Sequence, residues 1–302
     1  MLGELRAAVA RGELVPERRG VYRTAPAPSA GPAHQLARTR DDYVATVRAV
    51  GRTFSAPIFT SYSAAVLLGL PIIGSWPREV YLLARGPNGR RRSAVVEVAR
   101  TRPVALSEVD GMAITTVEFT LLQLARHAPL VAALTATDAA LRVPRFGTAE
   151  PLTTIERLRR EHERLKPYPR SRRADAVLDR ATHLAETPLE TGSRLLIEEL
   201  GFATPELQHE LWLPEFGTRA FLDFHWPDVG VGAEADGRIK YDGDPRRAVA
   251  AVVAEKNREN AVRRQLRGFD RWEWDEMIAK HPVEQRLLRL GVPRVRRPTL
   301  LF

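Results

Sequence analysis

The sequence predicts a mixed α/β protein with two compact domains, and three features support this prediction. The chain has 302 residues, which exceeds the usual size of a single domain. Its first half alternates between helical and strand-like spacing of apolar residues. Its second half contains a helix, three strand-like segments, a long amphipathic helix and a last strand. That order favours a mixed sheet flanked by helices.

The chain begins with a short helix and a basic hairpin. Apolar residues are spaced as in a helix from Leu2 to Val9. Two short apolar pairs follow, Leu14-Val15 and Val21-Tyr22, and the residues between them (PERRG) are typical of a hairpin turn. A helix followed by a basic hairpin is the end of a winged-helix unit, so we assign residues 1–24 to a partial winged helix. Its candidate nucleic-acid contacts are Arg18 and Arg19.

Residues 25–148 are predicted to form an α+β domain with its own core, after a linker at Ala25 to Gly31 (APAPSAG). Ser61 or Ser63 is the expected cap of its second helix. The turn around Pro87-Asn88-Gly89 is expected to join its two strands. We expect helices at Asp41–Val50, Ser61–Leu68, Thr116–Ala128 and Leu130–Arg142, and strands at Glu79–Leu83 and Ala94–Ala99.

Residues 149–186 are predicted to be a charged helical connector. Eight Arg or Lys residues lie between Thr153 and Arg173, and the helix is expected to end at Pro167-Tyr168-Pro169. A connecting helix with a solvated face is favoured here over an element that contacts phosphate, and both interpretations stay open. The last segment, residues 282–302, is assigned as a basic tail.

The domain predicted at residues 187–281 contains the candidate chemistry. Thr187 is expected to cap its first helix, with Pro188 at the first helical position and Gly201 at the end. The strands are expected at Leu207–Leu213, Arg219–Trp226, Val229–Ala235 and Phe269–Trp274, and the crossover helix at Pro245–Arg267.

Two acidic residues in these strands are candidate metal ligands. Asp223 lies between apolar neighbours in the second strand, and Glu234 lies near the end of the third. Neighbouring antiparallel strands place side chains about 5 Å apart. We therefore expect the two carboxylates within roughly 4 to 6 Å, where they could share one divalent ion. Buried carboxylates need a metal or a basic partner, and Mg²⁺ or Mn²⁺ prefers such oxygen ligands and assists phosphodiester hydrolysis.

These residues belong to a pattern that resembles the Vsr-like branch of the PD-(D/E)XK nucleases. The pattern consists of Glu190 on a helix, Gln208, Leu222-Asp223-Phe224 and Gly232-Ala-Glu234-Ala-Asp236-Gly237. The resemblance covers about residues 187–277 and implies a restriction-endonuclease-like fold. It implies that Asp223 and Glu234 hold the metal and that Glu190 completes the acidic set.

The third strand departs from the PD-(D/E)XK pattern. Asp236 stands where that family has a lysine, and Lys240 or Lys256 is expected to supply the cation from another position. The candidate catalytic residues are therefore Glu190, Asp223, Glu234, Asp236, Lys240 and Lys256. Candidate nucleic-acid contacts in this domain are Arg238 and Arg258.

The first half resembles AbiEi-type antitoxins and transcriptional regulators over about residues 1–145. The segments that carry this resemblance are Gly12–Tyr22, Ser61–Pro71, Thr116–Ala125 and Asp138–Arg142. That family begins with a complete winged helix, of which the last helix and the wing fit this chain. The resemblance implies DNA and a cognate toxin protein as partners.

Composition narrows the function further. The net charge is +9, and the positive charge is mostly arginine, which favours polyanionic partners. The absence of cysteine excludes disulfides, zinc-thiolate sites and cysteine nucleophiles. The seven histidines show no metal-ligand spacing. Without a signal peptide or a long apolar run, we expect a cytoplasmic protein with no membrane partner.

Three functional hypotheses follow. The first is a DNA-directed, Mg²⁺- or Mn²⁺-dependent endonuclease with an AbiEi-like regulatory half. The second is a non-catalytic DNA-binding regulator or antitoxin of a toxin–antitoxin system, in which the nuclease fold serves only as a clamp. The third is a protein-interaction module that neutralises a toxin.

Overall fold

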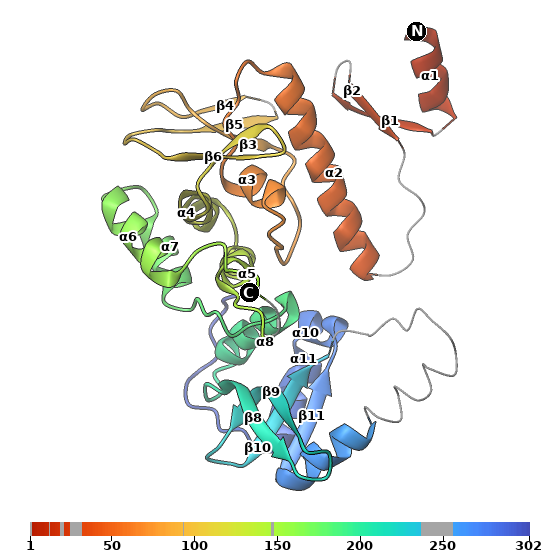
Figure 1. The fold of residues 1–302 in the computed structure, drawn as a ribbon, viewed down its shortest axis with the longest axis vertical. Coiled ribbons are helices and arrows are strands. Elements are labelled where there is room, and N and C mark those ends of the chain that lie inside the picture. Colours follow the sequence, from red (N-terminus) through yellow and green to blue (C-terminus); the bar gives the residue numbers. More distant parts are fainter. Residues whose placement is uncertain are drawn as a thin grey trace. The chain divides into compact units, whose positions relative to one another are not determined.

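The computed structural model describes residues 2–11, 13–18, 21–24, 32–92, 94–145, 148–236 and 256–302. It has a mixed α/β fold, which confirms the predicted class (Figure 1). The chain divides into two compact units. Unit 1 contains Met1–Leu141 and Pro151–Ala181, and unit 2 contains Arg142–Glu150 and Thr182–Phe302.

Unit 1 begins with the predicted helix and hairpin. Helix α1 (Leu2–Ala10) is followed by β1 (Leu14–Arg18) and β2 (Val21–Thr24), which pair antiparallel. Helix α2 (Pro32–Thr53) starts well before the predicted helix. Arg18 is the last residue of β1, and Arg19 lies outside the described residues.

Between Ser61 and Leu141, unit 1 combines helices with short strands. The elements are α3 (Ser61–Leu67), β3 (Val80–Leu83), β4 (Arg90–Arg92), β5 (Val95–Val98), β6 (Leu106–Val109), β7 (Met112–Thr115), α4 (Val117–His127) and α5 (Leu130–Leu141). Strands β3 and β5 are parallel, and β4 pairs antiparallel with β5. The predicted turn at 87–89 therefore leads into β4. This strand is not apparent from the sequence, because its three exposed residues are all arginine.

The cap of α3 differs from the prediction. The N-cap residue is Thr60, rather than Ser61 or Ser63. The Ser63 hydroxyl lies 2.8 Å from the Tyr43 hydroxyl and accepts a hydrogen bond from the Tyr81 backbone N–H, also at 2.8 Å. This serine therefore holds the core of unit 1 together instead of capping the helix.

The charged segment forms two helices, α6 (Ile155–Leu165) and α7 (Ser171–Leu178). Helix α6 ends just before Pro167, as predicted, but it also buries Leu158, His162 and Leu165. This apolar face explains why residues 151–181 belong to unit 1 and are not a separate connector.

Unit 2 is built on a four-stranded sheet with the order β11-β10-β9-β8 (Figure 1). The strands are β8 (Glu206–Leu213), β9 (Thr218–Trp226), β10 (Val231–Ala235) and β11 (Gly268–Trp272). Strands β8, β9 and β10 form an antiparallel meander, whereas β10 and β11 are parallel. The predicted strand order and the mixed sheet are thus confirmed.

Helices cover both faces of this sheet. Helix α8 (Pro188–Glu199) is capped by Thr187, as predicted, and its Ser193 hydroxyl accepts a hydrogen bond from the Trp272 indole at 2.7 Å. Phe269, which lies three residues before Trp272 and therefore faces the opposite side of β11, packs in a core cluster with Ala261 of the helical residues 256–265. Residues 237–255, the first part of the predicted crossover, lie outside the described residues.

The C-terminal residues are part of unit 2 instead of a free tail. They include α10 (Trp274–Ala279) and α11 (His281–Leu290), followed by a segment that runs along the end of α8. Buried Glu199 anchors this segment, because its carboxylate accepts backbone hydrogen bonds from Leu301 at 3.0 Å and Phe302 at 2.7 Å. The Lys280 ammonium donates to the same carboxylate at 2.6 Å.

We predict that Glu199→Gln lowers the free energy of unfolding of unit 2 by about 2 kcal/mol, since hydrogen bonds to a buried charged group are lost. Urea denaturation followed by tryptophan fluorescence measures this. The control is Glu215→Gln, whose half-exposed carboxylate pairs with Arg264. An exposed pair contributes less than about 1 kcal/mol, so equal losses in the two variants would contradict the anchoring role.

Candidate active site

A row of polar residues crosses the sheet of unit 2 at one level. The register of β8 and β9 places Gln208 opposite Asp223. The register of β9 and β10 brings Glu234 to the level of Asp223, and Glu234 is paired with Arg271 of β11. The row therefore contains Gln208, Asp223, Glu234 and Arg271, one residue from each strand.

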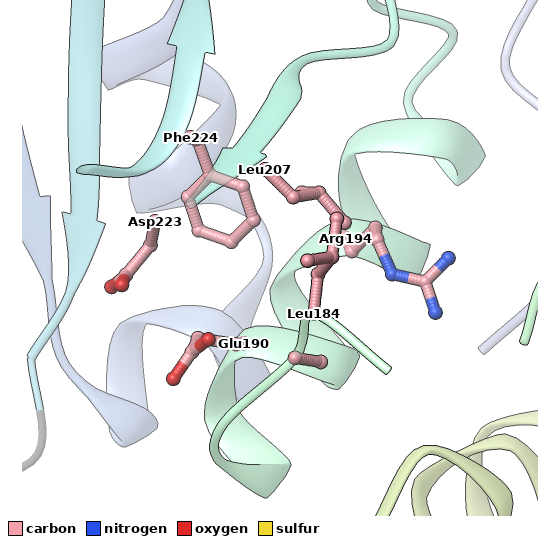
Figure 2. A pocket seen from close by; sticks show the side chains of 7 residues that line it. Leu184, Glu190, Arg194, Leu207, Asp223 and Phe224 are labelled. Atoms are coloured by element: carbon pink, nitrogen blue, oxygen red, sulfur yellow. The ribbon is translucent and has the colours of Figure 1, made fainter. Parts of the chain in front are cut away.

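Glu190 of α8 joins this row through Gln208. The Gln208 side-chain amide donates to the Glu190 carboxylate at 2.9 Å and to the Asp223 carboxylate at 3.2 Å. Figure 2 shows the two carboxyl groups pointing to the same side, away from Arg194. The small pocket at this point is lined by Leu184, Ala185, Glu190, Arg194, Leu207, Asp223 and Phe224. The predicted convergence of a helical glutamate on Asp223 is present in the structure.

Gln208 has an unusual backbone conformation for a strand residue. Its φ is +54°, in the left-handed region that non-glycine residues seldom occupy. The Arg145 guanidinium donates a hydrogen bond to the Gln208 side-chain oxygen. Two contacts hold Arg145 in place. Its guanidinium carbon lies 3.7 Å from the centroid of the Phe221 ring, and the guanidinium forms an ion pair with the Glu186 carboxylate at 2.8 Å. Strained backbone persists where surrounding contacts enforce it, and such positions cluster at functional sites.

Glu190 is buried and Asp223 is partly buried, and both accept hydrogen bonds from neutral groups. Asp223 accepts a backbone hydrogen bond from Ala235 at 2.8 Å, and Glu190 accepts from the Glu186 backbone at 2.9 Å and the Thr187 hydroxyl at 2.8 Å. Among the residues that the structure describes, these contacts and the Gln208 amide are neutral donors. The hydrogen bonds to the two carboxyls therefore bring no positive charge, although Arg194 lines the same pocket.

Burial and like charge shift both acids toward their protonated forms. Burial, followed by the charge of Glu190, raises the pKa of Asp223 to about 8, although hydrogen bonds from Ala235 and Gln208 oppose the shift. Burial also raises the pKa of Glu190. An acid with this pKa holds a proton at neutral pH unless a cation lies beside it.

Glu234 lies in a different environment from the one predicted. Its carboxylate accepts a hydrogen bond from Arg271 at 2.6 Å, and the Arg258 guanidinium lies 3.9 Å away. Arg271 also contacts Asp236 at 3.4 Å and Glu259 at 3.5 Å. Glu234 was expected to share one ion with Asp223, but Arg271 of the adjacent strand already neutralises it. Gln208 joins Asp223 to Glu190 instead.

Of the cationic residues Lys240, Lys256 and Arg238 that were predicted for this site, only Lys256 lies in the described part of the chain. Lys256 is exposed at the start of the helical residues 256–265, and Lys240 and Arg238 lie outside the described residues. In the described part of the chain, the positive charge beside Asp236 comes from Arg271. The signal for Arg271 was available in the sequence, since it is a charged residue between the aromatic residues Phe269 and Trp272 of the last strand.

Sequence reasoning missed a histidine cluster next to these acids. Glu206, His209 and His225 each offer a ligand atom, and the three atoms lie within 4.8 Å of one another. Within the residues that the structure describes, no other three such side chains have ligand atoms this close together. Glu190, Asp223 and Glu234 do not meet this distance as a group. The cluster combines two strands, so neither spacing along the chain nor a motif predicts it.

Comparisons of the chain with protein-family models, with curated proteins and with solved structures find no match. Among the described residues, no helix is long and apolar enough to cross a membrane. Both family resemblances therefore stay predictions, and the function must be argued from the residues themselves.

We predict a pH-dependent stability that originates from Asp223. Its folded pKa lies above the value of about 3.9 expected in the unfolded chain, so the folded state binds the proton more tightly. Stability is then fully present below about pH 4 and declines as the pH rises to about 8. In Asp223→Asn, the free energy of unfolding should fall less between these pH values than in the wild type. We expect the difference to exceed about 1.4 kcal/mol, the free energy of one pKa unit.

Urea denaturation at pH 5, 6.5 and 8 in a chelating buffer measures the effect. Asp228→Asn serves as the matched control, because Asp228 is an exposed acid that lies two residues after the end of β9. Identical pH profiles for wild type and Asp223→Asn would show that Asp223 does not hold this proton.

Proposed function

We propose that this protein is a divalent-cation-dependent nuclease that hydrolyses phosphodiester bonds in DNA, with Glu190 and Asp223 as its cation ligands. One observation carries the proposal. A partly buried aspartate with a pKa of about 8 is bridged to a buried glutamate, and the hydrogen-bond donors to both acids in the described residues are neutral. Perturbed carboxyls of this kind are typical of catalytic and metal sites.

The donor atoms of the two acids fit Mg²⁺ or Mn²⁺. Each carboxylate oxygen has two lone pairs. Both Asp223 oxygens and Glu190 Oε1 accept one hydrogen bond each in the described structure, so each retains a lone pair. Hard cations bind such oxygens, and a bound ion would offset the repulsion that raises the pKa of Asp223. When bound, the ion would supply Lewis-acid stabilisation of the charge on the scissile phosphate.

The neighbouring arginines suit the substrate. Arg258 and Arg271 flank Glu234, and a guanidinium offers paired donors that match phosphate oxygens. In the proposed complex, a DNA phosphate competes with Glu234 for Arg271, and the released Glu234 carboxylate then completes the acidic set. Lys240 and Lys256 stay candidates for the catalytic cation, and Arg238 stays a candidate for a phosphate contact.

Unit 1 is assigned the regulatory role that its resemblance to AbiEi-type proteins implies. In this proposal, α1 and the antiparallel β1–β2 hairpin serve as the last helix and the wing of a winged helix. Arg18 and Arg19 are the proposed DNA contacts there. A cognate toxin as partner and a cytoplasmic location belong to the same proposal.

A second candidate function is a non-catalytic DNA-binding regulator or antitoxin. The ion pair of Glu234 with Arg271 favours it, because a carboxylate that is already neutralised holds no metal. In this case the acidic row stabilises the sheet, and the fold acts as a DNA clamp. Its cleavage activity would be absent with any metal, whereas its DNA affinity would persist.

We predict that Asp223→Ala lowers Mg²⁺- or Mn²⁺-dependent cleavage of plasmid DNA by at least about a hundredfold, since a metal ligand supplies several kcal/mol. DNA affinity should stay almost unchanged, because arginines and not carboxylates contact the phosphates. Asp228→Ala is the matched control. Full cleavage by Asp223→Ala would contradict the assigned site, and a wild-type protein that binds DNA but cuts with neither ion would favour the regulator.

We also predict that DNA affinity falls steeply with salt, because arginine–phosphate contacts release condensed counterions. Arg258→Ala should reduce the slope of log affinity against log salt by about one. Arg219→Ala, at an exposed arginine of β9 that pairs with Glu210, should leave the slope unchanged. Fluorescence anisotropy with a labelled duplex measures both. Equal slopes for wild type and Arg258→Ala would remove Arg258 from the phosphate contacts.

A further inference from the structure

A second group of metal-ligating side chains lies on strands β8 and β9. It consists of Glu206 and His209 of β8 and His225 of β9, whose ligand atoms all lie within 4.8 Å of one another. The Nδ1 atoms of His209 and His225 lie 3.0 Å and 3.4 Å from the same Glu206 carboxylate oxygen. The two imidazole rings are stacked, with centroids 3.9 Å apart and an interplanar angle of 28°.

The distorted backbone at Gln208 brings these three residues together. Glu206 is paired with His225 in the β8–β9 ladder, so their side chains are neighbours. His209 follows Glu206 by three residues, and regular alternation would place it on the opposite face of the strand. The left-handed conformation of Gln208 (φ +54°) interrupts this alternation, and His209 stacks on His225 instead.

The separations match those between ligands of a bound transition metal. Zinc lies about 2.0–2.1 Å from imidazole nitrogen and carboxylate oxygen, so two ligands of a tetrahedral ion are about 3.3 Å apart. The observed separations of 3.0 Å and 3.4 Å bracket this value. Two imidazoles and a carboxylate also form a ligand set that zinc enzymes use with a fourth, open position.

We propose that Glu206, His209 and His225 bind a divalent transition-metal ion of the zinc class, at a site separate from the Glu190–Asp223 pair. The two sites differ in chemistry, since imidazole ligands select zinc, cobalt or nickel, whereas carboxylates alone suit magnesium or manganese. The Glu206 side chain is 55% exposed, so the ion is reached from solvent. Water or an anionic ligand fills the remaining position.

The position of this site defines its structural effect. Glu206 and His209 flank Gln208 on β8, and His225 follows Asp223 by two residues on β9. A bound ion therefore links the two strands at the point where Gln208 holds both acids. We expect metal binding to raise the melting temperature of the protein, because the folded state alone presents the three ligands together.

Titration of the full chain with Zn²⁺ and Co²⁺ tests the proposal. We expect saturable binding of one equivalent by calorimetry, with visible absorption bands of Co²⁺ in a nitrogen and oxygen site. His209→Ala and Glu206→Gln should weaken binding by at least about tenfold, because even partners of metal ligands contribute that much. His209 and Glu206 are partly exposed, so both variants are suitable for folding checks by circular dichroism.

His281→Ala is the matched control, because His281 also lies beside a glutamate three residues later, 3.6 Å from Glu284, but lacks a second histidine. It should bind zinc as the wild type does. Asp223→Asn should also keep zinc binding, which separates this site from the proposed nuclease site. A folded wild type that binds no zinc, or a folded His209→Ala that binds it equally well, would overturn the proposal and leave a hydrogen-bonded histidine pair.

Discussion

The contact on which the site of unit 2 depends is the hydrogen-bond bridge from Gln208 to Glu190 and Asp223. One amide nitrogen donates to both carboxyls, which joins α8 to the sheet and fixes the two acids beside each other. The amide carries no charge, so it positions the acids without neutralising them. Burial, followed by the charge of Glu190, raises the pKa of Asp223 to about 8. The same left-handed residue also aligns Glu206 and His209 on one side of β8.

Charge is distributed unevenly along the polar row, and this distribution separates the two candidate functions. At one end, Arg271 compensates Glu234, as in an ordinary buried ion pair. At the other end, the hydrogen-bond donors to Glu190 and Asp223 in the described structure are neutral, and the proposed cation would bind these two acids. A nuclease uses the second arrangement, whereas a DNA clamp needs neither. The proposed cation site therefore rests on Glu190 and Asp223, the two acids that Gln208 bridges, and not on the pair Asp223 and Glu234.

The sequence predicts much of unit 2 because its signals are local. The Thr187 cap, the apolar strands and the acid inside β9 are each read from a few neighbouring residues, and all are confirmed. What the sequence does not predict depends on contacts between distant segments. Arg145 reaches Gln208 from residues 142–150, and His209 meets His225 only because of one unusual φ angle. The ion pair of Glu234 with Arg271 was not predicted for the same reason, since Arg271 becomes its neighbour through the parallel pairing of β11.

The most direct test of the central claim is a crystal structure of the full chain soaked in Mn²⁺, with anomalous scattering to locate the ion. We expect an anomalous peak in contact with carboxylate oxygens of both Glu190 and Asp223, with the Gln208 amide still bonded to one of them. Absence of manganese at this position in well-ordered crystals, with Glu190 and Asp223 still sharing the Gln208 amide alone, would contradict it.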